Sequence, residues 1–420
     1  MNSGRPCILV YNPLAGHGHL DSWNALFVSI LMAGGHRVIA VTEDSGALSR
    51  RLEASGDLRS PNLQLFDLVD LRPGPCVRAF ARVGRVLRRI WRTLSRSPDP
   101  LACDPQAYYL EPVEFARHLN TVSKKARWAP SLVLNMYMDL YRTDEARWQA
   151  FDREQSLPWV GIRFIPPENP TEGYYGTKSL SGMCFLDERV VDAYRAIFPR
   201  KQFFFLPDVT HSDLPDESSA LLQRIVREAA GRKIVFLGGT IVKSKNIAAW
   251  FRLIAMADPQ QWYFVQIGEI RWDELDAQEL QALRAAIDSP PGNLLVHDAY
   301  LPDERTFNEI MRASDIIFAV YRDFRISSNM LGKAAAFDKP ILVADNHLMG
   351  TRVARYGIGR AVPQDDPEAM LLALNQLIDP LHACTGFRDY REAFGHQVLA
   401  RRLGDLIDHC RDLPAGRDAA

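Results

Sequence analysis

Two successive series of short apolar segments, each segment followed by a loop and a helical pattern, constrain the fold of this chain most strongly. Cys7–Tyr11 opens the first series and Lys233–Leu237 opens the second. Continuous apolar runs of this length are typical of strands buried on both faces of a parallel sheet. Strands that alternate with helices indicate an α/β fold. The 420 residues suit two domains of about 200 residues each.

The apolar runs predict the strands of both series. Those of the first are expected at Cys7–Tyr11, Arg37–Thr42, Leu63–Val69, Ser131–Tyr137, Trp159–Phe164, Met183–Leu186 and Phe203–Leu206. Those of the second are expected at Lys233–Leu237, Trp262–Ile267, Asn293–Val296, Asp315–Tyr321, Pro340–Ala344 and Arg360–Val362. A polar, Pro-containing stretch separates the two series and is interpreted as a linker. We therefore expect an N-terminal domain at 1–206, a linker at 207–231, a C-terminal domain at 232–386 and a helical segment at 387–420.

Composition excludes several classes of protein. Lys plus Arg number 50 and Asp plus Glu 51, so the net charge of -1 argues against a general nucleic-acid binder. The six Cys form no C-x-x-C pair, which favours reduced core residues over a zinc site or a disulfide framework. The sequence shows no signal peptide and no apolar run of about 18 residues. A cytoplasmic protein without a membrane-spanning helix is expected.

The loop after the strand at Lys233–Leu237 is the first candidate anion site. It reads Gly238-Gly239-Thr240-Ile241-Val242-Lys243-Ser244-Lys245-Asn246 and leads into a helix. Glycine lets a backbone approach a ligand closely, and the N-terminus of a helix attracts an anion. The alternative is an ordinary strand-to-helix turn with solvated lysines. The residues predicted to bind phosphate are Gly238, Gly239, Thr240, Lys243 and Lys245.

The segment 321–340 is the second candidate anion site. It follows a buried strand and opens a helix that Ser327 or Ser328 would cap. The free N–H groups and side chains of Ser328 and Asn329 are predicted to hold a diphosphate. Arg325 lies just before the helix and Lys333 lies within it. An ordinary capped helix with Arg325 on the surface is the alternative.

With these two loops and Asp338-Lys339-Pro340-Ile341, the sequence resembles the GT-B glycosyltransferases, particularly the retaining, family-4-like group. The resemblance covers the architecture of the whole chain and implies two Rossmann-like domains facing across a cleft. Its residue-level motifs match only in the C-terminal half. The family's loop lysine corresponds to Lys245, and the loop arginine is missing. Arg325 and Lys333 occupy the positions of the family's Glu-x7-Glu acids, so both positions are basic here.

The resemblance implies roles for further residues. Arg325 takes a position that the family uses near the donor sugar, and we expect it in the catalytic centre together with His17 of the first loop. Gly268 fits the glycine that borders the nucleotide base, and Tyr300 could stack on that base or be a structural tyrosine. The residues expected to bind the acceptor are Gly16, Gly18, His19, Asp139 and Arg163, although solvated or structural roles are the alternative for each.

An acid-free, Arg-rich segment lies at 71–98. Within it, apolar residues recur at steps of three and four, which predicts a helix with one apolar face and a basic remainder. Such a helix can lie on an anionic bilayer, and a core-packed helix with a solvated basic face is the alternative. The residues expected to contact the membrane are Phe80, Arg85, Arg88, Arg89, Trp91 and Arg92.

Together these features predict transfer of a sugar from a nucleoside diphosphate sugar to a lipid-linked or polysaccharide acceptor at the inner membrane face. No Asp-x-Asp pair follows a strand, so we expect neither a metal nor a cofactor, and the diphosphate would be held by Lys245, Arg325 and helix N-termini. Two alternatives remain: a GT-B epimerase acting on a UDP-sugar, and a degenerate glycosyltransferase that serves as a membrane scaffold.

Overall fold

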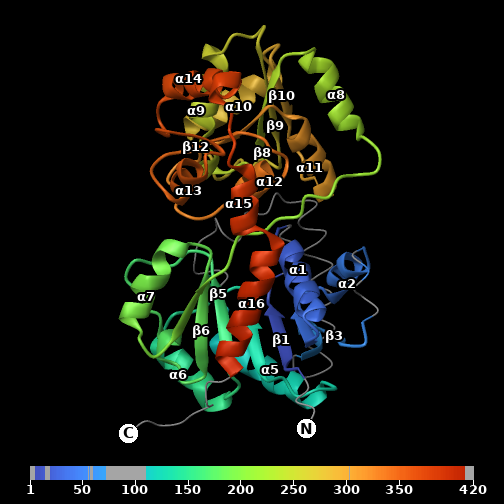
Figure 1. Cartoon of the computed structure of the whole chain (residues 1–420), viewed down its shortest axis with the longest axis vertical. Helices are drawn as coiled ribbons and strands as arrows, with labels where there is room; N and C mark the ends of the chain where they lie inside the picture. The colour runs from blue at the N-terminus through green and yellow to red at the C-terminus, as the bar shows by residue number, and fades with distance from the viewer. Residues whose placement is uncertain are drawn as a thin grey trace. The chain divides into compact units, whose positions relative to one another are not determined.

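The computed structural model describes residues 5–14, 19–54, 56, 60–71, 110–301 and 303–411. The chain divides into two compact units (Figure 1). Unit 1 consists of Met1–Pro207 and His396–Ala420, and unit 2 of Asp208–Gly395. The polypeptide therefore passes between the units twice, once after Pro207 and once after Gly395.

A fully parallel sheet forms the centre of unit 1. Its spatial order is β3-β2-β1-β4-β5-β6-β7. All six residues of β1 are buried, as predicted for a strand covered on both faces. The strands are β1 (Cys7–Asn12), β2 (Arg37–Thr42), β3 (Leu63–Asp67), β4 (Leu132–Asn135), β5 (Trp159–Arg163), β6 (Leu180–Phe185) and β7 (Gln202–Phe205).

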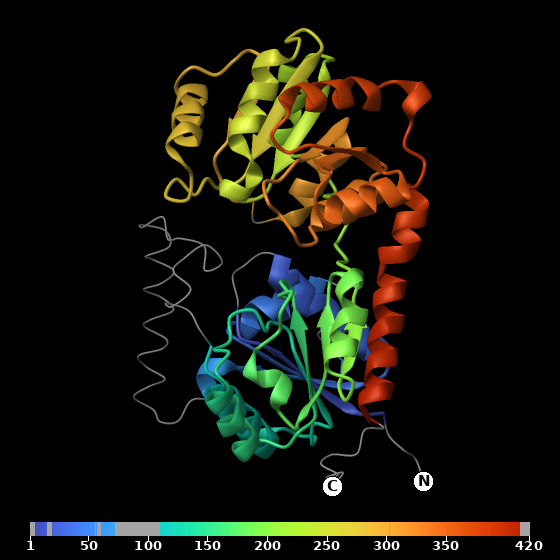
Figure 2. The same cartoon turned by 90° about the vertical axis from the view of Figure 1, so that its left-hand side faces the viewer.

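Helices flank this sheet (Figures 1 and 2). Helices α5 and α6 pack against each other and share a core with β1, β4 and β5. The last of the described helices contacts α1, β4 and β7. The helices described in unit 1 are α1 (His19–Ala33), α2 (Ser45–Ala54), α3 (Leu68–Leu71), α5 (Pro112–Lys125), α6 (Glu145–Glu154), α7 (Val191–Ile197) and α16 (His396–Arg411), with the short turns η1 (Gly173–Gly176) and η2 (Glu188–Val190).

A second parallel sheet forms the centre of unit 2. Its spatial order is β10-β9-β8-β11-β12-β13, so the chain leaves β8 toward one edge and β11 toward the other. The strands are β8 (Lys233–Gly238), β9 (Trp262–Ile267), β10 (Leu294–His297), β11 (Ile316–Ala319), β12 (Ile341–Ala344) and β13 (Gly359–Val362).

The helices of unit 2 form two layers about this sheet, with α9 in contact with both α10 and α14, and α12 in contact with α11 and α15. An Asp276–Glu279 capping box begins α10, and Gly357 ends α13 in a left-handed conformation. The helices are α8 (Ala220–Ala229), α9 (Ile247–Met256), α10 (Ala277–Asp288), α11 (Glu304–Ala313), α12 (Asn329–Ala336), α13 (Leu348–Tyr356), α14 (Pro367–Leu377) and α15 (Phe387–Phe394), with η3 (Lys243–Lys245) and η4 (Pro380–His382).

The segment predicted as a linker at 207–231 lies almost wholly in unit 2. Asn308 Nδ2 donates hydrogen bonds to the carbonyl oxygens of His211 and Asp213 at 3.2 and 2.9 Å. Ser219 N donates to Glu309 Oε1 at 3.1 Å, and the Ser219 side chain caps α8. These contacts fasten the segment to α11. The predicted helical segment 387–420 is divided, because α15 belongs to unit 2 and α16 to unit 1.

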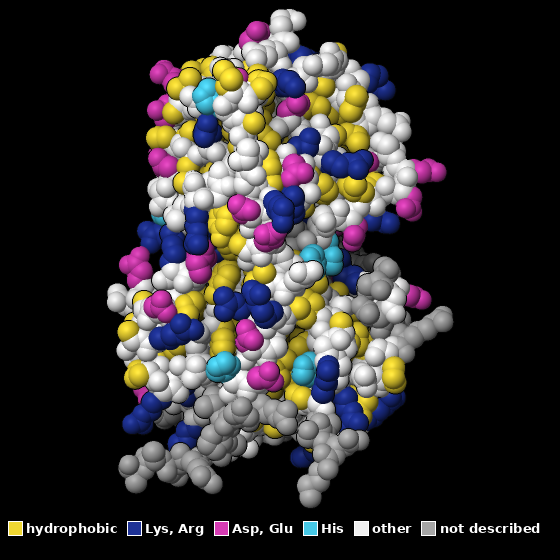
Figure 3. Space-filling model, in the orientation of Figure 1, with side chains coloured by type: hydrophobic (Ala, Val, Ile, Leu, Met, Phe, Trp, Pro, Cys, Tyr) yellow, Lys and Arg dark blue, Asp and Glu magenta, His cyan; other side chains and the backbone are white. Residues whose placement is uncertain are grey.

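On the face shown in Figure 3, positive and negative side chains are interspersed on both units. This distribution matches the near-equal totals of acidic and basic residues in the sequence. None of the helices in the described ranges is long and apolar enough to cross a membrane.

Candidate functional site in unit 2

The carboxyl ends of β8 and β11 meet at the centre of the unit 2 sheet. The two strands are neighbours, and the chain leaves them in opposite directions. In open α/β sheets, ligands bind at such a switch point, outside the carboxyl ends of the strands. Both candidate anion loops follow these strands, so the fold brings the two loops together as the sequence predicts.

Two glycines allow the loops after β8 and β9 to touch. Gly239 has φ +91° and Gly268 has φ +148°. A Cβ atom on Gly268 would lie 1.9 Å from the Gly239 carbonyl oxygen, so only glycine fits there. Ile241 N then donates a hydrogen bond to Glu269 O at 2.9 Å, which extends the pairing of β8 and β9 into the loops that follow them. Gly238 differs from these two, since its missing side chain makes room for the rings of Phe236 and Phe307.

Lys245 lies at the junction of the two loops. Its ammonium donates to Gly238 O at 3.0 Å and to the Tyr321 hydroxyl at 2.8 Å. It also lies 4.1 Å from the centre of the Tyr321 ring, which is a cation–π contact. The side chain is half-buried, whereas that of Lys243, in the same turn, is exposed. Lys245 therefore places a fixed positive charge at the switch point.

Asn246 fastens the two loops to each other, a role that sequence reasoning missed. Its side chain is fully buried and its backbone is left-handed, with φ 58°. Its Nδ2 donates to Val320 O at 3.2 Å and to Gln364 O at 2.7 Å, and its Oδ1 accepts from Arg322 Nη2 at 3.2 Å. Asparagine tolerates the left-handed conformation better than most residues, and this was the available signal in the sequence.

The helix that follows β11 begins as predicted. Ser328 is the N-cap of α12, and its side chain accepts from Met330 N at 3.3 Å. Ser327 Oγ accepts a hydrogen bond from Arg352 Nη1 at 2.8 Å. Arg352 is buried, and its guanidinium lies 4.5 Å from the centre of the Phe394 ring. An arginine on α13 thus positions the start of α12, a contact that no local sequence pattern indicates.

Arg325 and Lys333 occupy different surroundings. Arg325 is exposed on the loop before α12. Lys333 is buried, and its ammonium donates to Glu304 Oε1 at 2.8 Å, to Asn308 Oδ1 at 2.6 Å and to His211 O at 3.0 Å. Burial lowers the pKa of Lys333, and Glu304 opposes that shift. Since an ammonium has three hydrogens, these contacts use all of them, and we leave Lys333 out of the donor site proposed below.

The remaining donor-site candidates also follow strands of this sheet. Gly268 comes directly after β9, and its N–H donates to His297 O at 3.1 Å. Tyr300 lies beyond the end of β10 and is 54% exposed, which makes it a surface residue and not a core tyrosine. Thr240 lies half-buried in the loop after β8. Asn329 is the first residue of α12.

In unit 1 the structure brings together Asp139, which lies beyond the end of β4, and Arg163, the last residue of β5. Arg163 Nε lies 3.9 Å from Asp139 Oδ1, and its Nη2 lies 3.0 Å from Glu172 Oε1. Its Nη1 donates to the Tyr174 hydroxyl at 2.5 Å. Burial raises the pKa of the Asp139 carboxyl, while Arg163 and backbone N–H groups oppose that shift. The cluster is largely buried and holds the loop after β5 in place.

Other residues predicted in unit 1 fall outside what the structure describes. Gly16, His17 and Gly18 lie outside the described ranges, as does the segment 72–109 with all the predicted membrane contacts. His19 begins α1.

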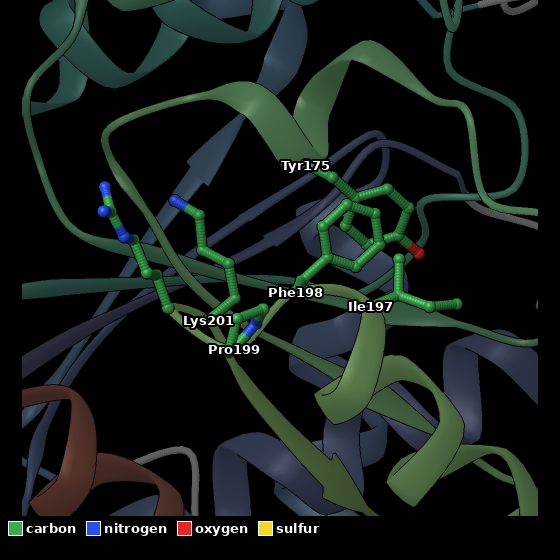
Figure 4. A pocket seen from close by; sticks show the side chains of 6 residues that line it. Tyr175, Ile197, Phe198, Pro199 and Lys201 are labelled. Atoms are coloured by element: carbon green, nitrogen blue, oxygen red, sulfur yellow. The ribbon is translucent and has the colours of Figure 1, made fainter.

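A hollow of about 300 Å³ lies at the surface of unit 1 (Figure 4). It is lined by the end of α7 and the residues that precede β7, with the Tyr175 and Phe198 rings stacked 4.6 Å apart. It therefore adjoins the amino end of β7. Ligands of open α/β sheets bind at the opposite ends of the strands, so we do not include the hollow in the candidate site.

Comparison with models of protein families and with curated protein sequences finds no match. Solved structures do match. Sucrose-phosphate synthase from Thermosynechococcus elongatus has a TM-score of 0.64 at 14% identity, covering 96% of this chain and 98% of the other. Anabaena HepE in complex with UDP and glucose has a TM-score of 0.61 at 11% identity, covering 96% of this chain and 100% of the other. UDP-GlcNAc 2-epimerase from Neisseria meningitidis bound to UDP-GlcNAc has a TM-score of 0.56 at 12% identity, covering 95% of this chain and 98% of the other. The chain thus has the GT-B fold, with two Rossmann-like units.

Proposed function

We propose that the chain is a glycosyltransferase that takes its sugar from a nucleoside diphosphate sugar. The observation that carries this proposal is the ammonium of Lys245, held 3.0 Å from Gly238 O where the loops after β8 and β11 meet. Support also comes from two of the similar structures, because Anabaena HepE was solved with UDP and glucose and the Neisseria meningitidis epimerase with UDP-GlcNAc. We take UDP as the first nucleotide to test.

The proposed chemistry follows from charge. When the bond between the sugar and the diphosphate breaks, negative charge grows on the diphosphate, and positioned cations and N–H groups stabilise it. In our proposal Lys245 and Lys243 face the diphosphate from the β8 loop. Ser328 and Asn329 do so from the start of α12, and Arg325 lies nearer the sugar. The sequence contains no Asp-x-Asp pair, so we assign the stabilisation to these groups of the chain itself.

The experiment is a binding panel on the full chain. Thermal unfolding and calorimetric titration should show stabilisation and binding by one of UDP, GDP, ADP and CMP, or by the matching sugar nucleotides. The control is Lys233→Ala, because Lys233 lies at the opposite, amino end of β8 and its ammonium pairs with Asp315 Oδ1 at 3.0 Å. The control should bind like the wild type. If no nucleotide binds the wild-type chain, the proposal is wrong. That result would favour the alternative of a degenerate glycosyltransferase that serves as a membrane scaffold.

An epimerase is the second candidate, because the Neisseria meningitidis epimerase shares the fold. The two activities differ in their need for an acceptor. A transferase releases UDP from a UDP-sugar when an acceptor is present, whereas an epimerase converts the UDP-sugar to its isomer without one. Analysis of the sugar nucleotide after incubation without acceptor separates the two, and formation of an isomer would favour the epimerase.

We further propose that the acceptor is lipid-linked or a growing polysaccharide, reached from an anionic membrane surface. The support is the sequence of 71–98, which has eight arginines and no acidic residue. The full chain should float with vesicles that contain phosphatidylserine, and high salt should release it. Charge reversal at Arg88 and Arg89 should abolish flotation, while Arg224→Glu on α8 should not. Equal flotation with uncharged vesicles, or none with anionic vesicles, would contradict the proposal.

A further inference from the structure

Arg322 stands beside the proposed phosphate-binding loop but is not one of the cations predicted from the sequence. Its backbone N–H donates to Ser244 O at 2.8 Å, within the turn that carries Lys243 and Lys245. Its Nη2 donates to Asn246 Oδ1 at 3.2 Å. The start of the Arg322 side chain is therefore fixed next to the two lysines, at the carboxyl edge of β8 and β11.

The charged partners of Arg322 hold it only loosely. Its Nη1 lies 3.6 Å from Glu279 Oε1 and 3.8 Å from Asp276 Oδ2, both beyond ordinary hydrogen-bond distance. Within the described part of the chain, Glu279 Oε1 has no hydrogen-bond partner, although it is buried. Burial raises the pKa of the Glu279 carboxyl, and Arg322 only opposes that shift. The side chain of Arg322 itself is 21% exposed, so solvent reaches it.

The backbone after Arg322 is held in a defined conformation. Asp323 has a left-handed backbone, with φ 50°. Its N–H donates to Gln364 Oε1 at 2.8 Å, and its carboxylate accepts from Gln364 Nε2 at 3.2 Å. A non-glycine residue in this region is uncommon and requires such support from its surroundings. The base of the arginine is thus rigid, whereas its guanidinium lacks close carboxylate contacts.

We propose that Arg322 is a second diphosphate-binding cation, which exchanges its distant contacts with Glu279 and Asp276 for the phosphate oxygens of a bound nucleoside diphosphate. This inference rests on the proposed function and supplies the site with the arginine that the β8 loop lacks. A guanidinium can bind two phosphate oxygens at once, which a lysine cannot do. The nearby carboxylates then act as competitors that hold the arginine while the site is empty.

The experiment compares UDP with uridine on the wild-type chain and on four full-length variants. Arg322→Ala should weaken UDP binding about 10-fold or more and leave uridine binding unchanged, because uridine has no phosphate. Arg322→Lys should recover part of the loss. Glu279→Gln should tighten UDP binding, since the amide can still accept the hydrogen bond from Asp276 N but carries no competing charge. The control is Arg224→Ala, which breaks an exposed ion pair with Glu228 at 2.7 Å. It should leave the binding of UDP and of uridine unchanged.

The outcomes separate this inference from the function on which it rests. If the wild-type chain binds UDP and Arg322→Ala binds it equally well, Arg322 is not a phosphate ligand while the proposed function stands. If Arg322→Ala weakens UDP and uridine alike, or Glu279→Gln weakens UDP as much as Arg322→Ala does, the pair is structural and the inference is wrong. If the wild-type chain binds no nucleoside diphosphate, both proposals are wrong.

Discussion

Replacement of Lys245 by alanine should weaken UDP binding by about 10- to 100-fold. A hydrogen bond to a charged group contributes about 1.5–3 kcal/mol, and the ammonium of Lys245 is the fixed charge at the meeting point of the loops after β8 and β11. Calorimetric titration with UDP measures the loss. The melting temperature of the unbound variant should fall only slightly, because Lys245 is half-buried and lies in a loop.

Two comparisons make the Lys245 result specific. Tyr321→Phe removes the hydroxyl 2.8 Å from the ammonium but keeps the ring beneath it, so UDP binding should change little. Lys233→Ala removes an ion-paired lysine from the other end of β8 and should bind like the wild type. UDP binding by Lys245→Ala at wild-type affinity would refute the phosphate assignment.

Replacement of Lys333 by alanine should cost about 3 kcal/mol of unfolding free energy, a loss typical of removing one partner from a buried charged network. It leaves Asn308 Oδ1, which is buried, without its donor. It also removes one of the hydrogen bonds to the His211 carbonyl, which keeps the one from Asn308 Nδ2. The Glu304 side chain is 27% exposed and can bind water once the lysine is gone. The expected loss is therefore at the lower end of the range for a broken buried ion pair. Urea unfolding of the full chain measures it.

Matched variants separate the charge of Lys333 from its packing. Lys333→Met keeps most of the side-chain volume and should lower the free energy of unfolding less than Lys333→Ala does. Glu304→Gln keeps an acceptor for the ammonium and should cost less still. If Lys333→Ala retains wild-type stability yet loses UDP binding, the lysine faces the nucleotide, and the network seen around it is not what holds unit 2 together.

The sheets were largely predictable from the sequence, since buried parallel strands appear as uninterrupted apolar runs. Arg37–Thr42 and Trp262–Ile267 match β2 and β9 at both ends. Leu63–Val69 was predicted too long, because α3 begins at Leu68 directly after β3. Helices α5 and α6 were not predicted. In α5 the signal was present, because Phe115, Leu119 and Val122 recur on one helical face and are buried.

The candidate site was only partly predictable, because its supports come from distant parts of the chain. Lys245 and Ser328 lie in loops with local signatures, namely a glycine pair and a helix cap. Asn246 and Arg352 act through contacts with Gln364 and Ser327, which lie far away in sequence. Lys333 occupies a position that suggested ligand binding, yet its surroundings are set by α11 and by His211. The roles of His17 and of the arginine-rich segment stay predictions.

The return of the chain to unit 1 has a consequence for how the protein is made. Unit 2 is one continuous stretch, so it can begin to fold as soon as it leaves the ribosome. Unit 1 lacks α16 until all of unit 2 has been synthesised. That helix buries Leu399, Leu403, Leu406 and Ile407. A chain that stops before His396 therefore exposes the apolar surface those residues cover, and we expect such truncated chains to aggregate while the separate unit 2 fragment stays soluble.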